Sequence, residues 1–215
     1  MKPAAVIFDC DGVIVDSEPT TFTLLAEDFA QHGLIVSPAQ IALDFMGGTI
    51  AGVAQMARAK GAALPLDWVD AFYEKLYSRL ALGTPLVPGI LAVLDHLDTH
   101  RIPYAIGSNG SDRKMQVTLG QHPGLVARFQ GRIFSGQTLG KPKPAPDLYL
   151  KAARSMGVDP SRCVVVDDSA AGCAGAAAAG IPCFGFAAHD DGARLRAQGA
   201  TVFHHMADLI GLLGQ

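Results

Sequence analysis

Residues 6–18 read VIFDCDGVIVDSE, an apolar run followed by two acids one residue apart and then a glycine. The apolar run predicts a short buried β-strand, and Gly12 favours a turn directly after it. A turn alone would need one polar residue, so the pair Asp9 and Asp11 calls for a further explanation. Because side chains alternate along a strand, both acids are expected to point to the same side.

Short apolar runs of this kind alternate along the chain with helical patterns. The predicted strands cover residues 5–8, 104–107, 132–134, 163–166, 182–186 and, more weakly, 201–203. Amphipathic stretches such as residues 90–97 and 148–156 lie between them. The alternation predicts an α/β fold, a Rossmann-like doubly wound parallel sheet buried on both faces. The small-residue run AAGCAGAAAAG at 170–180 is expected to form a helix packed closely on this sheet.

One interval, residues 17–83, breaks the alternation, because its apolar residues recur at helical spacing and no convincing strand appears. We therefore predict two domains. Residues 1–16 and 84–215 form the α/β core domain, and residues 17–83 form an inserted α-helical module. The segments near 16–19 and 83–89 contain Gly or Pro and are expected to be the linkers.

The composition limits the class of protein. With 215 residues and 49% apolar content, the chain can bury a substantial core. A net charge of -3 without a basic stripe argues against a nucleic-acid partner. The N-terminal apolar run is too short for a signal peptide or a membrane span, so we expect a cytoplasmic protein, monomeric by default, without membrane contact. The four cysteines contain no C-x-x-C pair, and three of them lie in or beside apolar runs, where a buried apolar side chain is expected rather than a disulfide or a zinc ligand.

Polar side chains follow the carboxyl ends of three predicted strands. Ligands of open parallel sheets bind beyond these ends, so the polar groups are predicted to share one site. They are Asp9 and Asp11 after the first strand, Ser108, Asn109 and Gly110 after the second, and Asp167, Asp168 and Ser169 after the fourth.

The four carboxylates in this set repel one another, by about 4 kcal/mol for a pair about 4 Å apart at an effective dielectric constant near 20. Such a cluster needs a cation or raised pKa values. Oxygen ligands favour Mg²⁺, so Asp9, Asp11, Asp167 and Asp168 are candidate metal ligands. The structural alternative is that Asp168 or Ser169 caps the following helix and that Asp11 forms an Asx turn.

A phosphate-sized anion also has candidate donors in this set. Ser108 supplies a hydroxyl group, and the amides of Asn109 and Gly110 precede a predicted helix N-terminus, which attracts anions. The segment GKPKPAPDLYL at 140–150 adds Lys141 and Lys143 as possible counter-charges. Solvated surface lysines are the alternative for both.

In this order the segments resemble the four signature motifs of the haloacid dehalogenase superfamily of aspartate-nucleophile phosphotransferases. DCDGVIVDSE is similar to the first motif, D-x-D-G, and Ser108 in GSNG to the second. Lys143, rather than Lys141, precedes Pro-Ala-Pro-Asp and is similar to the third motif, and VVVDDSAAG is similar to the fourth. The resemblance covers nearly the whole chain and implies that residues 17–83 are the cap domain of this family.

The resemblance implies a Mg²⁺-dependent phosphatase that works through an aspartyl-phosphate. Asp9 would attack phosphorus. Asp11 would protonate the leaving oxygen, activate the hydrolytic water and give the metal its backbone carbonyl. The remaining roles implied are Mg²⁺ binding by Asp9, Asp167 and Asp168, and binding of phosphoryl oxygens by Ser108, Asn109, Gly110 and Lys143.

Two features distinguish subgroups of this family. Dehalogenases proper lack an acid at the position of Asp11 and need no metal, so the resemblance implies a phosphatase or a phosphomutase. The β-phosphoglucomutase type carries Lys and Arg around a glycine-containing cap loop, where the stretch DFMGGTIAGV at 44–53 has Met46 and Ile50. Neither side chain can pair with a second phosphate, which disfavours the mutase.

The segments SNGSDRKMQVTLG, FSG and VVDDSAAG resemble bacterial sugar-phosphate phosphatases of the 6-phosphogluconate phosphatase type. This implies a small phosphorylated substrate, a sugar phosphate or a sugar-acid phosphate. Because the cap of this family closes over the substrate, the loop 45–50 and Glu18 are candidates to face it, with a helix end and a solvated acid as the alternatives.

Three other functions compete with this interpretation. A β-phosphoglucomutase-type phosphomutase is the enzymatic alternative. A phospho-acceptor receiver module is the non-enzymatic one, but such modules run to about 120 residues and carry the acceptor acid after a later strand. A D-x-D glycosyltransferase would need a nucleotide site, and nothing in the sequence indicates one.

Overall fold

The computed structural model describes residues 2–45 and 49–214. The chain divides into two compact units. The first, called here the α/β unit, comprises Met1–Asp16 and Pro85–Gln215, and the second, the helical unit, comprises Ser17–Thr84.

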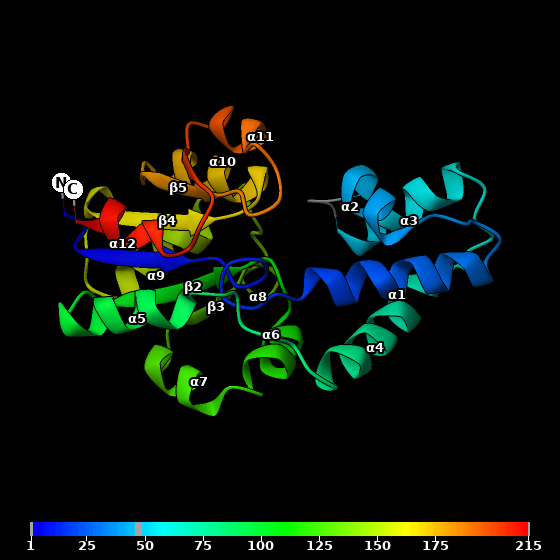
Figure 1. Ribbon diagram of the computed structural model, residues 1–215, viewed down its shortest axis with the longest axis horizontal. Helices are drawn as coiled ribbons and strands as arrows, with labels where there is room; N and C mark the ends of the chain where they lie inside the picture. Colours follow the sequence, from blue (N-terminus) through cyan, green and yellow to red (C-terminus); the bar gives the residue numbers. More distant parts are fainter. Residues whose placement is uncertain (1, 46–48, 215) are drawn as a thin grey trace. The chain divides into compact units, whose positions relative to one another are not determined.

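The α/β unit is built on a six-stranded sheet with the order β3-β2-β1-β4-β5-β6. Every pair of neighbouring strands is parallel, and β1 lies between β2 and β4 (Figure 1). The strands are β1 (Ala5–Phe8), β2 (Tyr104–Ser108), β3 (Ile133–Ser135), β4 (Cys163–Asp167), β5 (Cys183–Phe186) and β6 (Thr201–Phe203). The chain order reverses between β1 and β4, which is the point where such sheets bind ligands.

Helices cover both faces of this sheet because side chains of one strand alternate between two cores. Val6 and Phe8 of β1 belong to one core, which contains residues of α5, α6, α7 and α12, whereas Ala5 and Ile7 belong to the other, which contains residues of α9, α10 and α11. The helical segments are α5 (Ile90–Thr99), α6 (Asp112–Leu119), α7 (Pro123–Phe129), α8 (Gly136–Leu139), α9 (Asp147–Ser155), the 3₁₀ turn η1 (Pro160–Arg162), α10 (Ala170–Ala178), α11 (Ala193–Arg196) and α12 (Asp208–Leu213). The predicted doubly wound α/β fold is thus confirmed.

The small-residue run forms α10, as predicted, with Gly172, Cys173, Gly175 and Ala176 buried. A Cβ atom at Gly175 would lie 3.3 Å from Cε2 of Tyr149, so the absence of side chains lets the helix approach its neighbour closely. All four cysteines are free thiols and buried, which agrees with the prediction of apolar core side chains for three of them.

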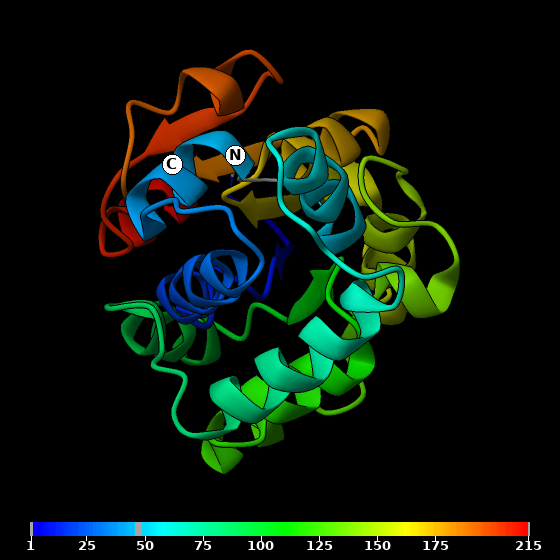
Figure 2. The same ribbon diagram turned by 90° about the vertical axis from the view of Figure 1, so that its right-hand side faces the viewer.

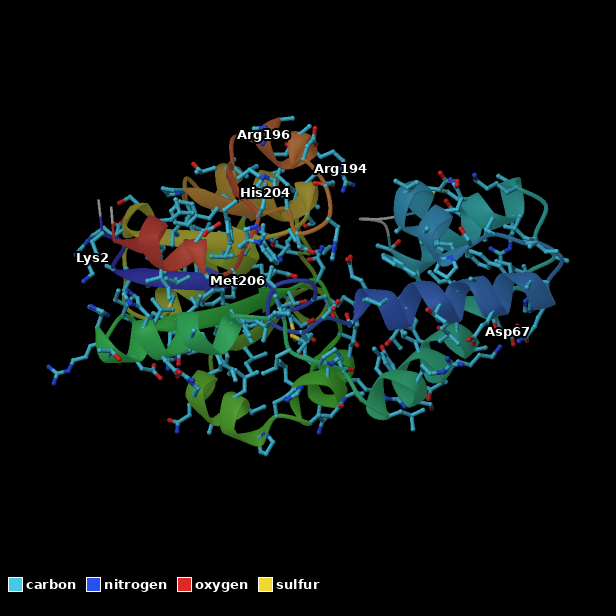
Figure 3. All side chains as sticks on the ribbon, viewed as in Figure 1. Lys2, Asp67, Arg194, Arg196, His204 and Met206 are labelled. Carbon is cyan, nitrogen blue, oxygen red and sulfur yellow. The ribbon has the colours of Figure 1, made fainter. Side chains whose placement is uncertain are left out.

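Loops at the periphery of the α/β unit are held by local contacts. Gly89 precedes α5 with φ of 90°, and a Cβ atom there would lie 3.3 Å from Cβ of Met206, which is labelled in Figure 3. Arg194 of α11, also labelled, forms an ion pair of 3.0 Å with Asp190 in the loop after β5. These contacts position the loops rather than contribute to the site described below.

The helical unit contains α1 (Glu18–Gln31), α2 (Pro38–Phe45), α3 (Ile50–Ala59) and α4 (Trp68–Ala81). Helix α1 contacts α2 and α4, and α3 contacts α4 (Figure 2). Trp68 stacks on Phe29 and Phe72, with ring centroids 5.7 and 4.8 Å apart, and forms the centre of the core. No helix among the described residues is both long and apolar enough to cross a membrane.

Candidate active site

The ends of three neighbouring strands bring the sequence motifs to one edge of the sheet. Phe8 of β1 is in register with residues of both β2 and β4, so these strands end at nearly the same level. Asp9 follows β1 and its amide donates a hydrogen bond of 2.8 Å to the carbonyl of Val166, while Ser108 closes β2 and Asp167 closes β4. Buried parallel strands therefore place Asp9, Ser108 and Asp167 at a common edge.

Lys143 links two of these carboxylates. Its Nζ donates to Oδ1 of Asp9 and, at 2.7 Å, to Oδ2 of Asp167, and all three side chains are buried. Burial would lower the pKa of Lys143, but Asp167 and Asp9 outweigh it and raise the pKa above its usual range. Lys143 is therefore a permanent cation at this edge. The neighbouring Lys141 is exposed and pairs with Asp147 at 2.6 Å, outside this cluster.

Both carboxylate oxygens of Asp167 accept hydrogen bonds. Besides Lys143, its Oδ2 accepts a hydrogen bond of 2.6 Å from the Tyr149 hydroxyl, and its Oδ1 accepts from the Ser169 amide and hydroxyl at 2.9 and 2.7 Å. Burial alone would raise the pKa of Asp167, but Lys143, Tyr149 and Ser169 hold that pKa below its usual value. Asp167 is thus an ionised carboxylate that fixes Lys143.

For Asp9, in contrast, the effect of burial on the pKa outweighs the effect of Lys143. Burial raises its pKa to about 7; Lys143 opposes this shift, while the carboxylates of Asp167 and Asp11 add to it. The ammonium of Lys143 therefore does not offset the cost of burying the Asp9 carboxylate. Additional positive charge at this edge would keep Asp9 ionised at neutral pH.

The segment after β2 is organised by side-chain contacts. Ser108 is buried, and its Oγ accepts a hydrogen bond of 2.9 Å from the Gly110 amide. The Gly110 amide, which the sequence predicts to bind an anion, thus forms a local hydrogen bond in this structure. The side chain of Asn109 clamps the backbone of Lys143: its Oδ1 accepts from the Lys143 amide at 2.7 Å and its Nδ2 donates to the Lys143 carbonyl at 3.2 Å. Helix α6 begins after Ser111, whose hydroxyl accepts from the Lys114 amide at 3.1 Å.

Asp11 forms an ion pair with Lys114 of α6, with 2.9 Å between its Oδ1 and Nζ. Burial would lower the pKa of Lys114, but the charge of Asp11 outweighs it and raises the pKa above its usual value. Sequence analysis missed Lys114, and it also missed Tyr149. No motif signals either residue, because each lies inside a helix whose facing partner is set only by the fold.

Asp168 lies against the turn after β1. A Cβ atom on Gly12 would fall 1.9 Å from Oδ2 of Asp168, so the carboxylate occupies the space that the glycine leaves, and the φ of 78° at Gly12 also requires glycine there. The cap of α10 is Ser169, whose side chain accepts from the Gly172 amide at 3.0 Å. The helix-capping alternative therefore applies to Ser169 and not to Asp168.

The candidate metal ligands come from the loops after β1 and β4. Within residues 2–45 and 49–214, no three acidic, histidine or cysteine side chains are already arranged as a metal-binding group. The donors nonetheless fit a hard cation, because they are all oxygens.

The residues predicted to face the substrate from the cap belong to the helical unit. Glu18 is the first residue of α1, and Ile50 is the first residue of α3. Met46 and the rest of 46–48 lie outside the described residues. The remaining predicted site residues all belong to the α/β unit.

Comparison with known proteins defines the class of the protein. Residues 3–180 match the family model of haloacid dehalogenase-like hydrolases, so the chain belongs to this family, as its motifs predicted. It is an enzyme of the phosphatase class within the family.

Curated relatives with phosphatase names cover most of the chain. The chain is 29% identical to 6-phosphogluconate phosphatase of Escherichia coli (strain K12), over 95% of this chain and 92% of the relative. It is 32% identical to hexitol phosphatase A of the same strain, over 84% of this chain and 81% of the relative. A HAD family hydrolase from Deinococcus radiodurans R1, solved with bound phosphate and sodium, is similar with a TM-score of 0.84, 31% identity and coverage of 99% and 97%.

Proposed function

We propose that the protein is a Mg²⁺-dependent phosphatase that hydrolyses a small phosphorylated metabolite through an aspartyl-phosphate. The proposed substrate is a sugar phosphate or a sugar-acid phosphate such as 6-phosphogluconate, which the names of the relatives support. The observation that carries the proposal is the buried Asp9 at the end of β1, joined through Lys143 to Asp167. The proposal includes a monomer acting in the cytoplasm on a small-molecule partner.

The reaction proceeds in two steps on this chain's own residues. A carboxylate oxygen of Asp9 attacks phosphorus, the bond to the ester oxygen breaks, and Asp11 gives its proton to the leaving oxygen. In the second step a water molecule attacks phosphorus of the aspartyl-phosphate while the Asp11 carboxylate takes a proton from the water, and the bond between phosphorus and the Asp9 oxygen breaks. Inorganic phosphate leaves, and Asp9 and Asp11 return to their starting states.

The surrounding groups stabilise the charge that spreads over the phosphoryl oxygens. Lys143 carries the positive charge closest to Asp9, and its place is held by Asp167 and by the Asn109 clamp. The Ser108 hydroxyl accepts from the Gly110 amide, so its own proton can be donated to a phosphoryl oxygen. Burial of these groups strengthens their electrostatic effect.

A divalent cation would complete this site, held by Asp9, the backbone carbonyl of Asp11 and Asp168, with Asp167 as the fourth candidate. Bound Mg²⁺ would neutralise both the carboxylates and the phosphoryl oxygens. Both oxygens of Asp167 already accept hydrogen bonds, so direct ligation by Asp167 would compete with these contacts. The Deinococcus relative was solved with bound phosphate and sodium, which supports the proposal that this chain binds a phosphate group together with a cation.

The first test replaces Asp9, the proposed nucleophile. We expect the wild-type protein to hydrolyse p-nitrophenyl phosphate in the presence of Mg²⁺ and to lose this activity when the metal is chelated. Asp9→Asn removes the attacking carboxylate and should lower kcat by about 10³-fold or more. Lys141→Met is the matched control, because Lys141 is an exposed cation two residues from Lys143 and pairs only with Asp147 among the ion pairs described. Unchanged activity of Asp9→Asn would refute the mechanism.

The second test concerns the substrate. A panel of 6-phosphogluconate, hexitol phosphates and hexose phosphates should contain at least one compound with a higher kcat/KM than p-nitrophenyl phosphate, measured by phosphate release. Formation of glucose 6-phosphate from β-glucose 1-phosphate with the bisphosphate activator would instead favour the phosphomutase.

A further inference from the structure

Lys114 is a charged residue at the site that the steps above do not use. Its Nζ lies 2.9 Å from Oδ1 of Asp11, and its side chain is 17% exposed. We propose that Lys114 is a positioning residue that fixes one carboxylate oxygen of Asp11, so that the other faces the leaving group. This inference rests on the proposed function, because it assumes that Asp11 transfers the proton.

The backbone of Lys114 is fixed within α6. Its amide donates to the capping hydroxyl of Ser111 at 3.1 Å, and its carbonyl accepts from the Thr118 hydroxyl at 3.1 Å. Because the first turn of the helix is capped, the side chain starts from a defined point. Most of the side chain is also covered, which restricts the directions that the ammonium can take.

The second oxygen of Asp11 faces the groups that follow β2. A Cβ atom built on Gly110 would lie 3.4 Å from Oδ2 of Asp11 and 3.2 Å from Oγ of Ser108. Both oxygens therefore border the small space that the missing side chain of Gly110 leaves. With Oδ1 bound by Lys114, Oδ2 borders the same small space as the Ser108 hydroxyl, which is the proposed donor to the phosphoryl group.

No second cation of the cluster can take over this task. Lys143 is engaged by Asp9 and Asp167 and is fixed through its backbone by Asn109. Without Lys114, Oδ1 of Asp11 would lose this ion pair, and fewer molecules would have Oδ2 in place when the ester bond breaks. General acid catalysis depends on such placement.

The test compares two esters of nearly the same shape, p-nitrophenyl phosphate and phenyl phosphate, with the Mg²⁺-loaded enzyme. The leaving group of phenyl phosphate is the more basic and needs a proton, whereas p-nitrophenolate leaves without one. We expect Lys114→Met to lower kcat/KM for phenyl phosphate by about tenfold or more, a part of the 10²–10⁴-fold that general acid–base catalysis contributes. The same variant should change kcat/KM for p-nitrophenyl phosphate by less than about threefold, because kcat/KM reports the steps up to cleavage of the ester.

Two further variants separate the possible outcomes. Asp11→Asn should show the same selectivity for the leaving group, and adding Lys114→Met to it should cause no further selective loss if Lys114 acts through Asp11. Lys114→Arg keeps the charge and should retain most of the activity toward phenyl phosphate. An equal loss on both esters, or an additive loss in the double variant, would overturn the positioning role and indicate that Lys114 binds the phosphoryl group or only stabilises the fold. Loss of the proposed function itself would appear differently, as a wild-type protein inactive on both esters or an active Asp9→Asn.

Discussion

The side chain of Asn109 forms hydrogen bonds with the backbone of Lys143. The position of Asn109 directly after β2 had instead predicted that it binds an anion. The two hydrogen bonds, 2.7 Å from the Lys143 amide and 3.2 Å to its carbonyl, satisfy both polar groups of one peptide segment. A residue of the second motif thereby fixes the cation of the third. The proposed phosphate-binding roles of these two motifs therefore depend on each other.

Asn109→Ala should therefore affect stability and activity together. Removing the amide leaves the Lys143 N–H without its acceptor in a part-buried place, which should lower the free energy of unfolding by about 1–3 kcal/mol. The displaced ammonium should also lower kcat for p-nitrophenyl phosphate. Urea denaturation and steady-state kinetics measure the two effects, and Gln137→Ala is the control because its side chain contacts only the Asn109 carbonyl in this clamp, at 3.0 Å. If Asn109→Ala and Gln137→Ala have the same free energy of unfolding and the same kcat, the hydrogen bonds from Asn109 to Lys143 do not contribute to stability or activity.

At the scale of elements, helix α10 packs directly against the Asp167 carboxylate, because Gly172 has no side chain to separate them. A Cβ atom on Gly172 would lie 2.0 Å from Cγ of Asp167, so an alanine could fit only if the helix or the carboxylate moved. We expect Gly172→Ala to cost about 1–3 kcal/mol of stability, as overpacking does. Its activity should fall as well, because Asp167 holds Lys143.

Gly211 of α12 provides the matched control for this element. Outside the backbone of the helix itself, no atom of the described residues lies within 4 Å of a Cβ built there. Gly211→Ala should therefore be neutral or stabilise the protein by up to about 1 kcal/mol through helix propensity. Thermal unfolding followed by circular dichroism compares the two variants. Equal midpoints for Gly172→Ala and Gly211→Ala would show that α10 can shift without cost.

The strands could be predicted from the sequence because each is a short apolar run, and three of them are followed directly by polar residues. The predicted bounds either match the observed ones or differ from them by one residue, for example 104–107 against Tyr104–Ser108. The partners of the site carboxylates could not be predicted in the same way. Lys114 reaches Asp11 across about a hundred residues of chain, and Tyr149 reaches Asp167 from a helix, so both contacts depend on how helices pack on the sheet.

At the scale of the whole molecule, the chain consists of two units with separate cores. All the described polar contacts around Asp9 lie in the α/β unit, whereas the single tryptophan of the sequence, Trp68, lies in the core of the helical unit. Units with separate cores can lose structure independently. The fluorescence of Trp68 therefore reports on the helical unit alone.

Substitutions of Asp28 can test whether the two units unfold independently. Asp28 is buried in the helical unit and accepts hydrogen bonds from Trp68 Nε1 and from Lys75. Asp28→Ala leaves the indole N–H buried without an acceptor, so the free energy of unfolding reported by Trp68 should fall by about 1–3 kcal/mol. Asp28→Asn keeps an oxygen acceptor and should lose less.

The α/β unit supplies the internal reference for this experiment. Amide hydrogen exchange in β1, β2 and β4 should be the same in Asp28→Ala and in the wild-type protein, because no described residue of the helical unit belongs to the two cores that cover these strands. Faster exchange in these strands, in step with the shift in the Trp68 transition, would instead mean that the two units unfold as one. The stability of the strands that carry Asp9, Ser108 and Asp167 would then depend on the core around Trp68.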